Sequence, residues 1–409
     1  MSKKSILLLT QWFDPEPTFK GLLFAKALKK KGFDVEVVTG FPNYPGGTLY
    51  EGYKIRLRDL QFIDGVKVTR LALYPSHDSS ALKRILNYLS FAFTSLIYML
   101  FFAKRADVIY AYHPPLTIGV VAVVTRFFRR TPVVYDIQDM WPDTLQATGM
   151  LNNKKLLSFI GKVAQWVYAR IDQMVVLSPG FKRLLIQRGV EDEKITVIPN
   201  WCDENALTSA EVKKQDVFPE QDQSIKIMFA GNMGKAQALE VVIEAAQQLQ
   251  EKKANIAFIM IGGGLESKAL KAKSEALGLK NITFLAQMPM TEIGAYLEQA
   301  DVLLVHLKKD PLFEITIPGK TQAYLSIGKP ILMGVQGDAA DIVTQAKSGF
   351  VFEPENPDSL LAQIDKISQL QKQELVQMGQ NSKAYYDSHL SLKIGVDSFT
   401  RVFDSAIRE

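Results

Sequence analysis

The fold is decided by residues 5–40, SILLLTQWFDPEPTFKGLLFAKALKKKGFDVEVVTG. The opening run, SILLLT, is apolar throughout, which is typical of a strand covered on both faces. The next stretch, FKGLLFAKALKKKG, places Phe19, Leu23 and Ala27 on one helical face and lysines on the other. A second strand, FDVEVVTG, follows. This order predicts a parallel pair of strands joined by a right-handed crossover.

The same pattern returns at residues 225–264. The order is a strand (IKIMFAG), a glycine-bearing loop (NMGKAQ), a helix (ALEVVIEAAQQLQEKK) and a strand that ends in three glycines (IAFIMIGGG). Further strands are predicted at NITFLA, DVLLVHL and PILMGV. Between the two copies, residues 203–224 are polar and are interpreted as a linker. We therefore predict an α/β protein with two doubly wound, Rossmann-like domains facing across a cleft, with ligands beyond the carboxyl ends of the strands.

Length and composition exclude several classes of protein. The 409 residues exceed what one ordinary core uses, and 47% hydrophobic with 22% charged residues excludes a disordered or fibrous chain. Cys202 is the single cysteine, so a disulfide framework is excluded and a reducing compartment is favoured. The first residues do not resemble a secretory signal. We expect a cytoplasmic protein.

Charge is distributed unevenly along the chain. Residues 1–200 carry 27 Lys and Arg against 16 Asp and Glu, a net charge of +11, whereas the remainder carries 21 against 27, a net charge of −6. A basic half joined to an acidic half indicates an anionic partner for the first half alone, such as a membrane surface, a nucleic acid or a phosphorylated substrate.

Several cofactor motifs are absent from the sequence. Neither first loop contains the Gly-x-Gly-x-x-Gly dinucleotide fingerprint, and the chain has no Walker A motif, so a dehydrogenase or a P-loop enzyme is disfavoured. The sequence also lacks an Asp-x-Asp pair and any His/Cys cluster with ligand spacing. We expect no metal and no tightly bound cofactor.

An acidic run follows an apolar strand at residues 133–144, VVYDIQDMWPDT. Because burying carboxylates is costly, this run is either a solvated loop or the floor of a site, and its place at a strand end favours the site. Asp139 is the candidate to orient a hydroxyl group or to act as a base. Asp136 and Gln138 are interpreted as its support, and Asp143 as a helix cap.

A long apolar helix is predicted at Ile85–Ala103, ILNYLSFAFTSLIYMLFFA, between two pairs of basic residues. Its length would allow it to span a membrane, but it leads directly into DVIYAY, a further strand of the same parallel sheet. Two interpretations remain, a buried crossover helix and a helix docked at a lipid surface. Residues 125–131, TRFFRRT, add a second aromatic and basic edge. No nucleic-acid module is recognisable, so we expect no nucleic acid partner.

Five motifs together resemble the retaining glycosyltransferases of family 4. They are GFPNYPGG (40–47), YDIQDMWPDT (135–144), VLSPGFKRLLIQRGVEDEKITVIPNWCD (176–203), FAGNMGKAQALE (229–240) and IPGKTQAYLSIGKPIL (317–332). The resemblance covers nearly the whole chain in order. It implies the GT-B fold, and its nearest branch transfers N-acetylfucosamine or similar amino sugars during bacterial O-antigen and capsule assembly.

The resemblance also implies a domain organisation. Residues 1–203 are expected to form a domain that binds the acceptor, and residues 204–385 one that binds a nucleotide-sugar donor. Residues 386–409 are expected to form a helix that packs back toward the N-terminal domain.

On the donor side, the first loop and the helix at KTQAYL are expected to hold a diphosphate. Backbone N–H groups around glycines before a helix favour anions, and lysines add charge. Gln287 and Met288 are expected to meet the base, and the glycines Gly262 to Gly264 are expected to allow close approach of the backbone to the ligand. The residues expected to surround the diphosphate are Gly231, Asn232, Gly234, Lys235 and Lys320.

The chain departs from the family pattern in the donor motifs. Asn232 and Gln237 stand where relatives often carry Arg and Lys. The usual Glu-x7-Glu pair is incomplete, because Glu314 stands for the first member with a register shifted by one and Ala323 occupies the second position. Gln322 or a backbone group is the substitute for the contact with ribose.

On the acceptor side, the loop WFDPEPTFKG replaces a glycine-rich loop of the relatives. Gly21 remains from that loop, and Lys20 is a candidate to meet an acceptor diphosphate. His113 lies at a strand end, and Trp141 is expected to form a wall beside the acceptor.

The expected activity is transfer of a sugar, with retention, from a UDP-linked donor to a polyprenyl-diphosphate-linked acceptor at the inner face of the cytoplasmic membrane, where the protein would be peripheral. An N-acetylated amino sugar is the expected group. Two alternatives stay open: a sugar-nucleotide 2-epimerase of the same fold, and a subunit that binds a nucleotide sugar without catalysis. The oligomeric state is not predicted.

Overall fold

The computed structural model describes residues 3–76, 81–147, 149–208 and 224–408, and these form two compact units. Unit 1 comprises residues 1–199 and 395–409, and unit 2 comprises residues 200–394. The first division thus falls four residues before the boundary proposed from the sequence. Of the linker predicted at residues 203–224, Glu204–Leu207 forms a short helix, α7, in unit 2, and residues 209–223 lie outside the described residues.

Unit 1 is built on an eight-stranded sheet of order β3-β4-β2-β1-β5-β6-β7-β8, in which every pair except β3 and β4 is parallel. Residues of β1, β5 and β6 are buried almost throughout, as expected for strands covered on both faces. The strands are β1 (Ser5–Thr10), β2 (Asp34–Gly40), β3 (Arg58–Ile63), β4 (Val66–Leu71), β5 (Val108–Tyr112), β6 (Val133–Ile137), β7 (Gln173–Val176) and β8 (Ile195–Val197).

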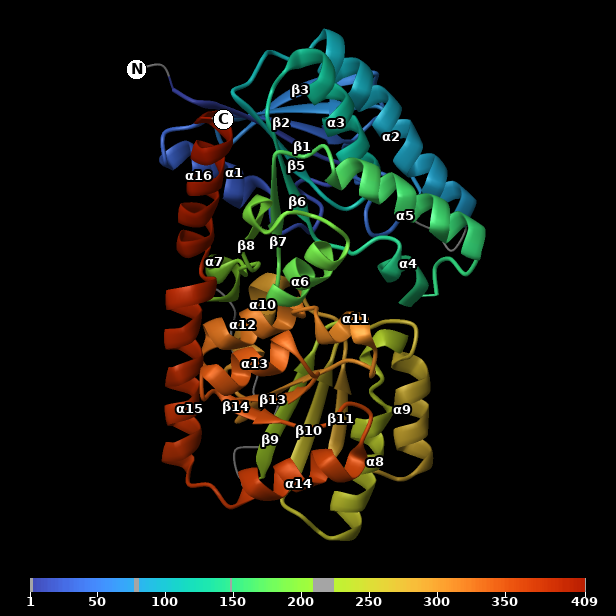
Figure 1. Cartoon of the computed structure of the whole chain (residues 1–409). Helices are drawn as coiled ribbons and strands as arrows, with labels where there is room; N and C mark the ends of the chain where they lie inside the picture. Colours follow the sequence, from blue (N-terminus) through green and yellow to red (C-terminus); the bar gives the residue numbers. More distant parts are fainter. Residues whose placement is uncertain (1–2, 77–80, 148, 209–223, 409) are drawn as a thin grey trace. The chain divides into compact units, whose positions relative to one another are not determined.

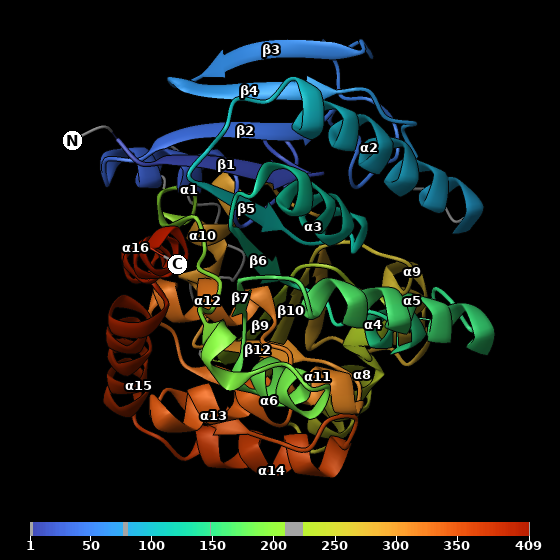
Figure 2. The same cartoon turned by 45° about the horizontal axis from the view of Figure 1, so that its top comes forward.

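Helices cover both faces of this sheet (Figure 1). The helices α2, α3 and α5 lie along one face, and α1 and α16 along the other (Figure 2). The helices are α1 (Leu22–Lys30), α2 (Ala81–Phe101), α3 (Thr117–Arg129), α4 (Asp143–Ala147), α5 (Lys154–Tyr168), α6 (Pro179–Gln187), the one-turn η1 (Asp192–Lys194) and α16 (Leu392–Arg408).

The buried face of α1 differs from the face predicted from the sequence. Phe24, Ala25 and Leu28 are buried, whereas Leu23 and Ala27 are only half-buried and Phe19 is exposed. The reason is that the helix begins at Leu22, where Asp14 Oδ2 accepts a hydrogen bond of 2.6 Å from the backbone N–H. Phe19 therefore belongs to the preceding loop. Phe24 packs edge-on against Phe399 of α16, at 5.0 Å between ring centroids.

Helix α2 crosses from β4 to β5, two strands of one sheet, as the sequence predicted for a crossover helix. By length and composition alone, the segment Leu82–Phe101 could span a membrane. Only 28% of its most apolar 18-residue stretch is buried inside the protein. The exposed apolar residues recur every three or four positions, which places them on one stripe of the helix. They are Leu82, Ile85, Leu86, Leu89, Phe93, Ile97 and Phe101.

Unit 2 contains a fully parallel six-stranded sheet of order β11-β10-β9-β12-β13-β14. The strand order reverses between β9 and β12, the switch point at which doubly wound sheets bind ligands. The strands are β9 (Ile225–Ala230), β10 (Ile256–Ile261), β11 (Ile282–Leu285), β12 (Val302–His306), β13 (Ile331–Gly334) and β14 (Gly349–Val351).

The helices α8, α9 and α14 share an apolar core with one face of this sheet, and α10 and α12 pack on β9 and β12. The helices are α7 (Glu204–Leu207), the one-turn η2 (Lys235–Gln237), α8 (Glu240–Glu251), α9 (Ser267–Ala276), α10 (Met290–Leu297), α11 (Pro311–Glu314), α12 (Gly319–Ile327), α13 (Asp338–Gln345), α14 (Pro357–Ser368), α15 (Lys372–Tyr385) and a π-helical turn, η3 (Tyr386–Leu390).

Candidate active site

In unit 2, the loops after β9, β10 and β12 meet at the switch point of the sheet. Tyr324 of α12 ties the end of β9 in place, because its hydroxyl accepts from Ala230 N at 2.9 Å and donates to Ala230 O at 3.2 Å. His306 Nδ1 lies 2.7 Å from Gln237 O, and its Nε2 accepts from Glu355 N at 3.0 Å, so Nδ1 carries the proton. This neutral histidine fixes η2 over the end of β12.

The glycines of these loops allow an approach that no side chain would permit. Gly231 and Gly262 have φ values of 136° and 141°, in the region that favours glycine. A Cβ atom at Gly262 would lie 2.0 Å from Gly231 O, and one at Gly264 would lie 2.5 Å from Met233 O. A Cβ at Gly263 would meet only Gln287 Oε1, at 3.7 Å. The close approach that the structure shows is thus between two loops of the protein, at Gly262 and Gly264, and the predicted approach of this backbone to a ligand stays a prediction.

Lys320, the second residue of α12, points into this loop. Its Nζ is buried, has no hydrogen-bond partner in the described part of the chain, and lies 3.5 Å from the centre of the Phe229 ring. A Cβ at Gly231 would lie only 3.1 Å from this nitrogen. Burial lowers the pKa of Lys320 from 10.5 to about 7. A buried cation without an anion, beside a loop that only glycine can form, is a prepared anion site.

The backbone of the first loop is used differently from the prediction. The N–H groups of Gly231, Met233 and Gly234 already donate inside the protein, to Ile261 O, Gly263 O and Gln237 Oε1. Gly231 and Gly234 therefore shape the loop rather than offer their own N–H groups. Within residues 231–238, the backbone N–H groups of Asn232, Lys235 and Ala236 have no acceptor among the described residues.

Asn232 and Gln237 stabilise this loop together. Asn232 Nδ2 donates to Gln237 Oε1 at 3.3 Å, the oxygen that also accepts from Gly234 N at 3.0 Å. The side chain of Lys235 is exposed to solvent. Gln237 thus holds the loop where the family pattern often has a cation, and Lys320 is the buried cation that remains beside it.

The other donor candidates lie on the loops after β11 and β12. Glu314, the last residue of α11, is half-buried, and its carboxylate makes no hydrogen bond or ion pair within the described residues. Gln322 is 1% exposed, and its amide nitrogen lies 2.9 Å from Pro318 O and 3.2 Å from Gly319 O. This amide therefore caps its own turn, which is a correction to its proposed contact with ribose. Ala323 is buried as well.

Gln287 and Met288 follow β11, and Gln287 is exposed beside Gly263. The loop that was predicted to meet the base therefore does adjoin the glycine-rich end of β10.

In unit 1, the acidic run after β6 separates into two roles. Asp136 is fully buried and accepts from Tyr110 Oη at 2.6 Å and from Gln138 Nε2. The Asp139 carboxylate has neither a hydrogen bond nor an ion pair within the described residues, and burial raises its pKa to about 6. Burial and then the Asp139 charge raise the pKa of Tyr44. Asp139 is thus the carboxylate left available, and Asp136 supports the strand end.

His113 and Trp141 form an aromatic wall next to this carboxylate. His113 is 1% exposed and lies edge-on to the rings of Trp141 and Tyr135, each at 5.8 Å between centroids. Burial lowers the pKa of His113 to about 3, so its ring is neutral. His113 Nδ1 has no hydrogen-bond partner in the described chain. The ring of Tyr88, on α2, lies 6.1 Å from that of Trp141.

Lys20 and Gly21 have structural roles that the sequence did not predict. Lys20 is fully buried, and its Nζ lies 5.3 Å from the centre of the Phe399 ring. Burial lowers the pKa of Lys20 to about 8, although the negative charge of Asp136 partly offsets this effect. Unlike Lys320, this lysine has an anionic side chain, Asp136, near it inside the protein, and its predicted contact with an acceptor diphosphate stays a prediction. A Cβ at Gly21 would lie 2.1 Å from Asp14 Oδ2, so this glycine makes room for the carboxylate that caps α1.

Two family models match the chain one after the other. The model of the glycosyl transferase 4-like domain matches residues 22–201, and that of the glycosyl transferases group 1 matches residues 211–385. The chain is a glycosyltransferase.

Among the relatives of the enzyme is the "Putative colanic acid biosynthesis glycosyl transferase WcaI" of Escherichia coli strain K12, which is 27% identical and covers 85% of this chain and 88% of its own. HepE of Anabaena, solved in complex with UDP-glucose, has a TM-score of 0.68 at 16% identity, with 98% of this chain and 99% of its own covered. WaaG, a glycosyltransferase involved in lipopolysaccharide biosynthesis, has a TM-score of 0.63 at 15% identity over 96% and 98% of the two chains. These structures show that the enzyme has the GT-B fold.

Sequence reasoning missed Glu16 of the glycosyltransferase. It is 2% exposed, and its carboxylate accepts from the backbone N–H groups of Phe13, Asn43 and Tyr44 at 2.7 to 3.1 Å. Burial raises its pKa to about 7, against these hydrogen bonds. Glu16 thus joins the loops after β1 and β2, where the rings of Trp12 and Tyr44 stack at 4.2 Å. In the sequence, Glu16 stands between Pro15 and Pro17, a pattern that is typical of a solvated loop and so gave no indication of a buried acid.

A metal centre has no support in the described residues, which contain no group of three or more His, Cys, Asp or Glu side chains able to hold an ion.

Proposed function

We propose that the protein transfers a sugar, with retention of anomeric configuration, from a UDP-sugar to a hydroxyl group of a polyprenyl-diphosphate-linked acceptor. The observation that carries the proposal is Lys320, whose buried ammonium has no anion of its own and lies against Gly231. A diphosphate would provide the missing negative charge, because charge-assisted hydrogen bonds to phosphate are strong in a desolvated site.

The chemistry follows from the residues at the two strand edges. As the bond from the anomeric carbon to the diphosphate breaks, negative charge grows on the departing oxygen, and Lys320 with the N–H groups of Asn232, Lys235 and Ala236 stabilises it. The acceptor hydroxyl forms the new bond to that carbon from the face that UDP leaves. Its proton passes to the departing diphosphate oxygen or to Asp139. Glu314 contacts the donor sugar.

A UDP-linked donor is supported by HepE, which was solved with UDP-glucose and shares the fold. The proposal that the transferred group is an N-acetylated amino sugar such as N-acetylfucosamine rests on the resemblance of the motifs alone. No resident cofactor is needed in this reaction, since the nucleotide sugar is a co-substrate.

The lipid-linked acceptor and the membrane partner are supported by the surface of unit 1. A stripe of exposed apolar side chains runs along α2, and the first half of the sequence is basic. Such a surface favours an anionic membrane. The names of WcaI and WaaG, with colanic acid and lipopolysaccharide biosynthesis, support a role in the assembly of a cell-surface polysaccharide. The enzyme would then be cytoplasmic and peripheral at the inner face of the membrane.

The deciding experiment has two stages. A thermal shift screen of UDP, GDP, ADP and dTDP identifies the base, because a ligand bound only to the folded state raises the melting temperature. UDP-sugars are then incubated with and without a polyprenyl-diphosphate sugar. Release of UDP that depends on the acceptor supports the transferase. Isomerised nucleotide sugar without an acceptor would establish the 2-epimerase, and tight UDP binding without turnover would establish a binding subunit.

A further inference from the structure

The C-terminal ends of α2 and α3 are joined by one arginine. Arg129, the last residue of α3, donates through Nη1 to Met99 O at 2.5 Å and to Ala103 O at 2.7 Å. Met99 lies in the last turn of α2 and Ala103 lies two residues beyond its end, so both carbonyls are at a helix end where intrahelical partners run out. The two helix ends are therefore held side by side, as both views of the fold also show (Figures 1 and 2).

Four phenylalanines surround this junction, and all of them are exposed. Phe101 and Phe102 at the end of α2 are 75% and 62% exposed, and Phe127 and Phe128 near the end of α3 are 76% and 67% exposed. The rings of Phe127 and Phe128 meet edge-on at 5.3 Å. Four large apolar side chains on one tip are more than scattered exposure explains, so this phenylalanine tip, residues 101, 102, 127 and 128, indicates an interaction site.

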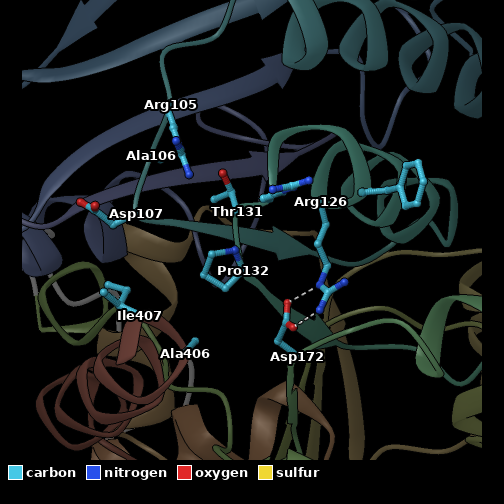
Figure 3. A pocket seen from close by; sticks show the side chains of 11 residues that line it. Arg105, Ala106, Asp107, Arg126, Thr131, Pro132, Asp172, Ala406 and Ile407 are labelled. Atoms are coloured by element: carbon cyan, nitrogen blue, oxygen red, sulfur yellow. Dashed lines mark hydrogen bonds and ion pairs between the residues drawn. The ribbon is translucent and has the colours of Figure 1, made fainter. Parts of the chain in front are cut away.

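A pocket of about 710 Å³ lies beside the phenylalanine tip. Phe127 contributes to its wall, together with the residues that precede β5, β6 and β7. It thus opens at the amino-terminal edge of the sheet, opposite to the strand ends that carry Asp139. Arg105 and Arg126 reach into the space between Asp107, Thr131 and Asp172 (Figure 3). The remaining walls come from α16, with Ala406 and Ile407.

The two carboxylates of this pocket already have hydrogen-bond or ion-pair partners, whereas two of its guanidinium groups have none in the described chain. Asp107 accepts from Ser5 N and Ser5 Oγ, each at 2.7 Å. Asp172 is paired with both Nε and Nη2 of Arg126, and also accepts from Val133 N.

Arg105 and Arg130 also line the pocket, and their guanidinium groups form no hydrogen bond or ion pair with any described residue. Both side chains are exposed, and so is Lys104, which precedes Arg105 in the sequence. The pocket therefore has spare positive charge in a fork geometry suited to phosphate.

We propose that this pocket binds the phosphate head group of an anionic phospholipid while the phenylalanine tip enters the acyl region of the same bilayer. The proposal rests on the membrane contact proposed above and adds a defined lipid site to it. Arg105 and Arg130 contact the phosphate, and Arg126 stays with Asp172 as part of the wall. A soluble phosphate compound would use the arginines but would leave the four phenylalanines exposed to water, so a lipid fits both features.

Flotation of the full-length protein with vesicles tests this site. The vesicles are phosphatidylcholine alone or phosphatidylcholine with about 30% phosphatidylglycerol. The wild-type protein should float with the anionic vesicles and less with the neutral ones. The variant R105E/R130E should lose at least about tenfold in binding to anionic vesicles, since each cation at the surface contributes a severalfold factor. The variant F127S/F128S should bind weakly to both.

The matched control is K268E/K271E, which makes the same change of net charge at two exposed lysines of α9 in unit 2. Equal loss of binding in this control would overturn the lipid site, because net charge alone would then be responsible. Wild-type flotation of R105E/R130E would also overturn it. A third contrary result would be glycerol phosphate binding at millimolar concentration without any flotation, which would assign the pocket to a soluble ligand.

Two measurements distinguish loss of lipid binding from misfolding and from loss of sugar transfer. The melting temperature shows whether R105E/R130E is folded, and R105Q/R130Q, which adds no negative charge, should show the same loss of flotation in a milder form. Sugar transfer to a short-chain acceptor in detergent should remain within about twofold of wild type for both variants. Loss of flotation with intact transfer supports the lipid site, whereas failure of transfer in the wild type would concern only the proposed function.

Discussion

Lys320 is costly to the protein without ligand, because its charge is buried and no described residue neutralises it. Its pKa in the folded chain, about 7, lies below the ordinary value of 10.5, and burial is the cause. Between these two values the unfolded chain binds more protons than the folded one, so stability rises with pH. The destabilisation is therefore complete below about pH 7 and disappears as pH approaches 10.5.

Replacing Lys320 with methionine should stabilise the protein and weaken its binding of UDP. The melting temperature at pH 7 should rise by a few degrees, about 2 to 4 °C for each kcal/mol in a domain of this size, and the gain should shrink toward pH 10. UDP affinity, measured by calorimetry, should fall at least about tenfold, the loss of one charge-assisted contact to phosphate. Lys235→Met is the control and should change stability little, because Lys235 is exposed. Unchanged UDP affinity in the Lys320 variant would remove this residue from the site.

Asp139 should control the acidic limb of the pH profile. Burial raises its pKa to about 6, so the carboxylate becomes available as a base only above that pH. Transfer should therefore increase as pH rises through about 6. Asp139→Asn should reduce transfer about 100-fold or more and remove this limb. UDP affinity should remain at the wild-type value.

Asp143→Asn is the matched control for Asp139, because Asp143 already pairs with Arg188 at 2.5 Å. It should leave both the rate and the pH limb unchanged. An acidic limb that persists in Asp139→Asn would assign the base to another group, and Glu16, whose pKa is raised to about 7, would be the next to test.

At the scale of loops and strands, the proposed donor site depends on the contact between the loops after β9 and β10. Gly262→Ala should break this contact, since the added Cβ would lie 2.0 Å from Gly231 O at a φ of 141°. The atoms that the new Cβ would meet are backbone atoms of Gly231, which cannot move aside as a side chain could. We therefore expect a loss of about 2 kcal/mol or more in the free energy of unfolding, together with loss of UDP binding. Denaturant unfolding and calorimetry measure the two effects.

Gly263→Ala provides the control on the same loop. Its Cβ would meet only a side-chain oxygen of Gln287 at 3.7 Å, an ordinary contact distance. Stability should stay within about 0.5 kcal/mol of wild type, as for other substitutions that meet no obstacle. If both variants bound UDP equally well, the close approach of the two loops would have no part in donor binding.

The sequence predicted the parallel sheets, because apolar runs and helical periods depend on near neighbours in the chain. It also placed three glycines at the end of β10, but it could not show that another loop packs against Gly262, because that loop lies some thirty residues earlier in the chain. The burial of Lys20 was not predicted for the same reason. Its surroundings include Asp136 and Phe399, and no local pattern in the sequence connects these residues. Glu16 was missed because two of its three hydrogen-bond partners, Asn43 and Tyr44, lie on the loop after β2.

For the whole molecule, the chain returns to unit 1 only at its end. The last helix, α16, supplies Phe399 and Phe403, whose rings pack on Tyr110 at 5.4 and 5.5 Å. Two ion pairs, Lys4 with Asp404 and Lys31 with Asp397, join it to β1 and α1. Unit 1 therefore depends on residues about two hundred positions away from the rest of its chain, whereas the sheet of unit 2 is built from one continuous segment.

Ending the chain at Ile394 should therefore unfold unit 1 and spare unit 2. Loss of two buried phenylalanines alone costs about 6 to 10 kcal/mol, comparable with the whole stability of a domain. UDP binding by calorimetry should survive, because every residue proposed to bind the donor lies in unit 2, whereas sugar transfer and the near-ultraviolet signal of unit 1 should be lost. A chain that ends at Ile407 keeps the apolar residues of α16 and should behave as wild type. A folded unit 1 in the shorter chain would show that α16 is an accessory helix, and loss of UDP binding would show that unit 2 cannot fold without it.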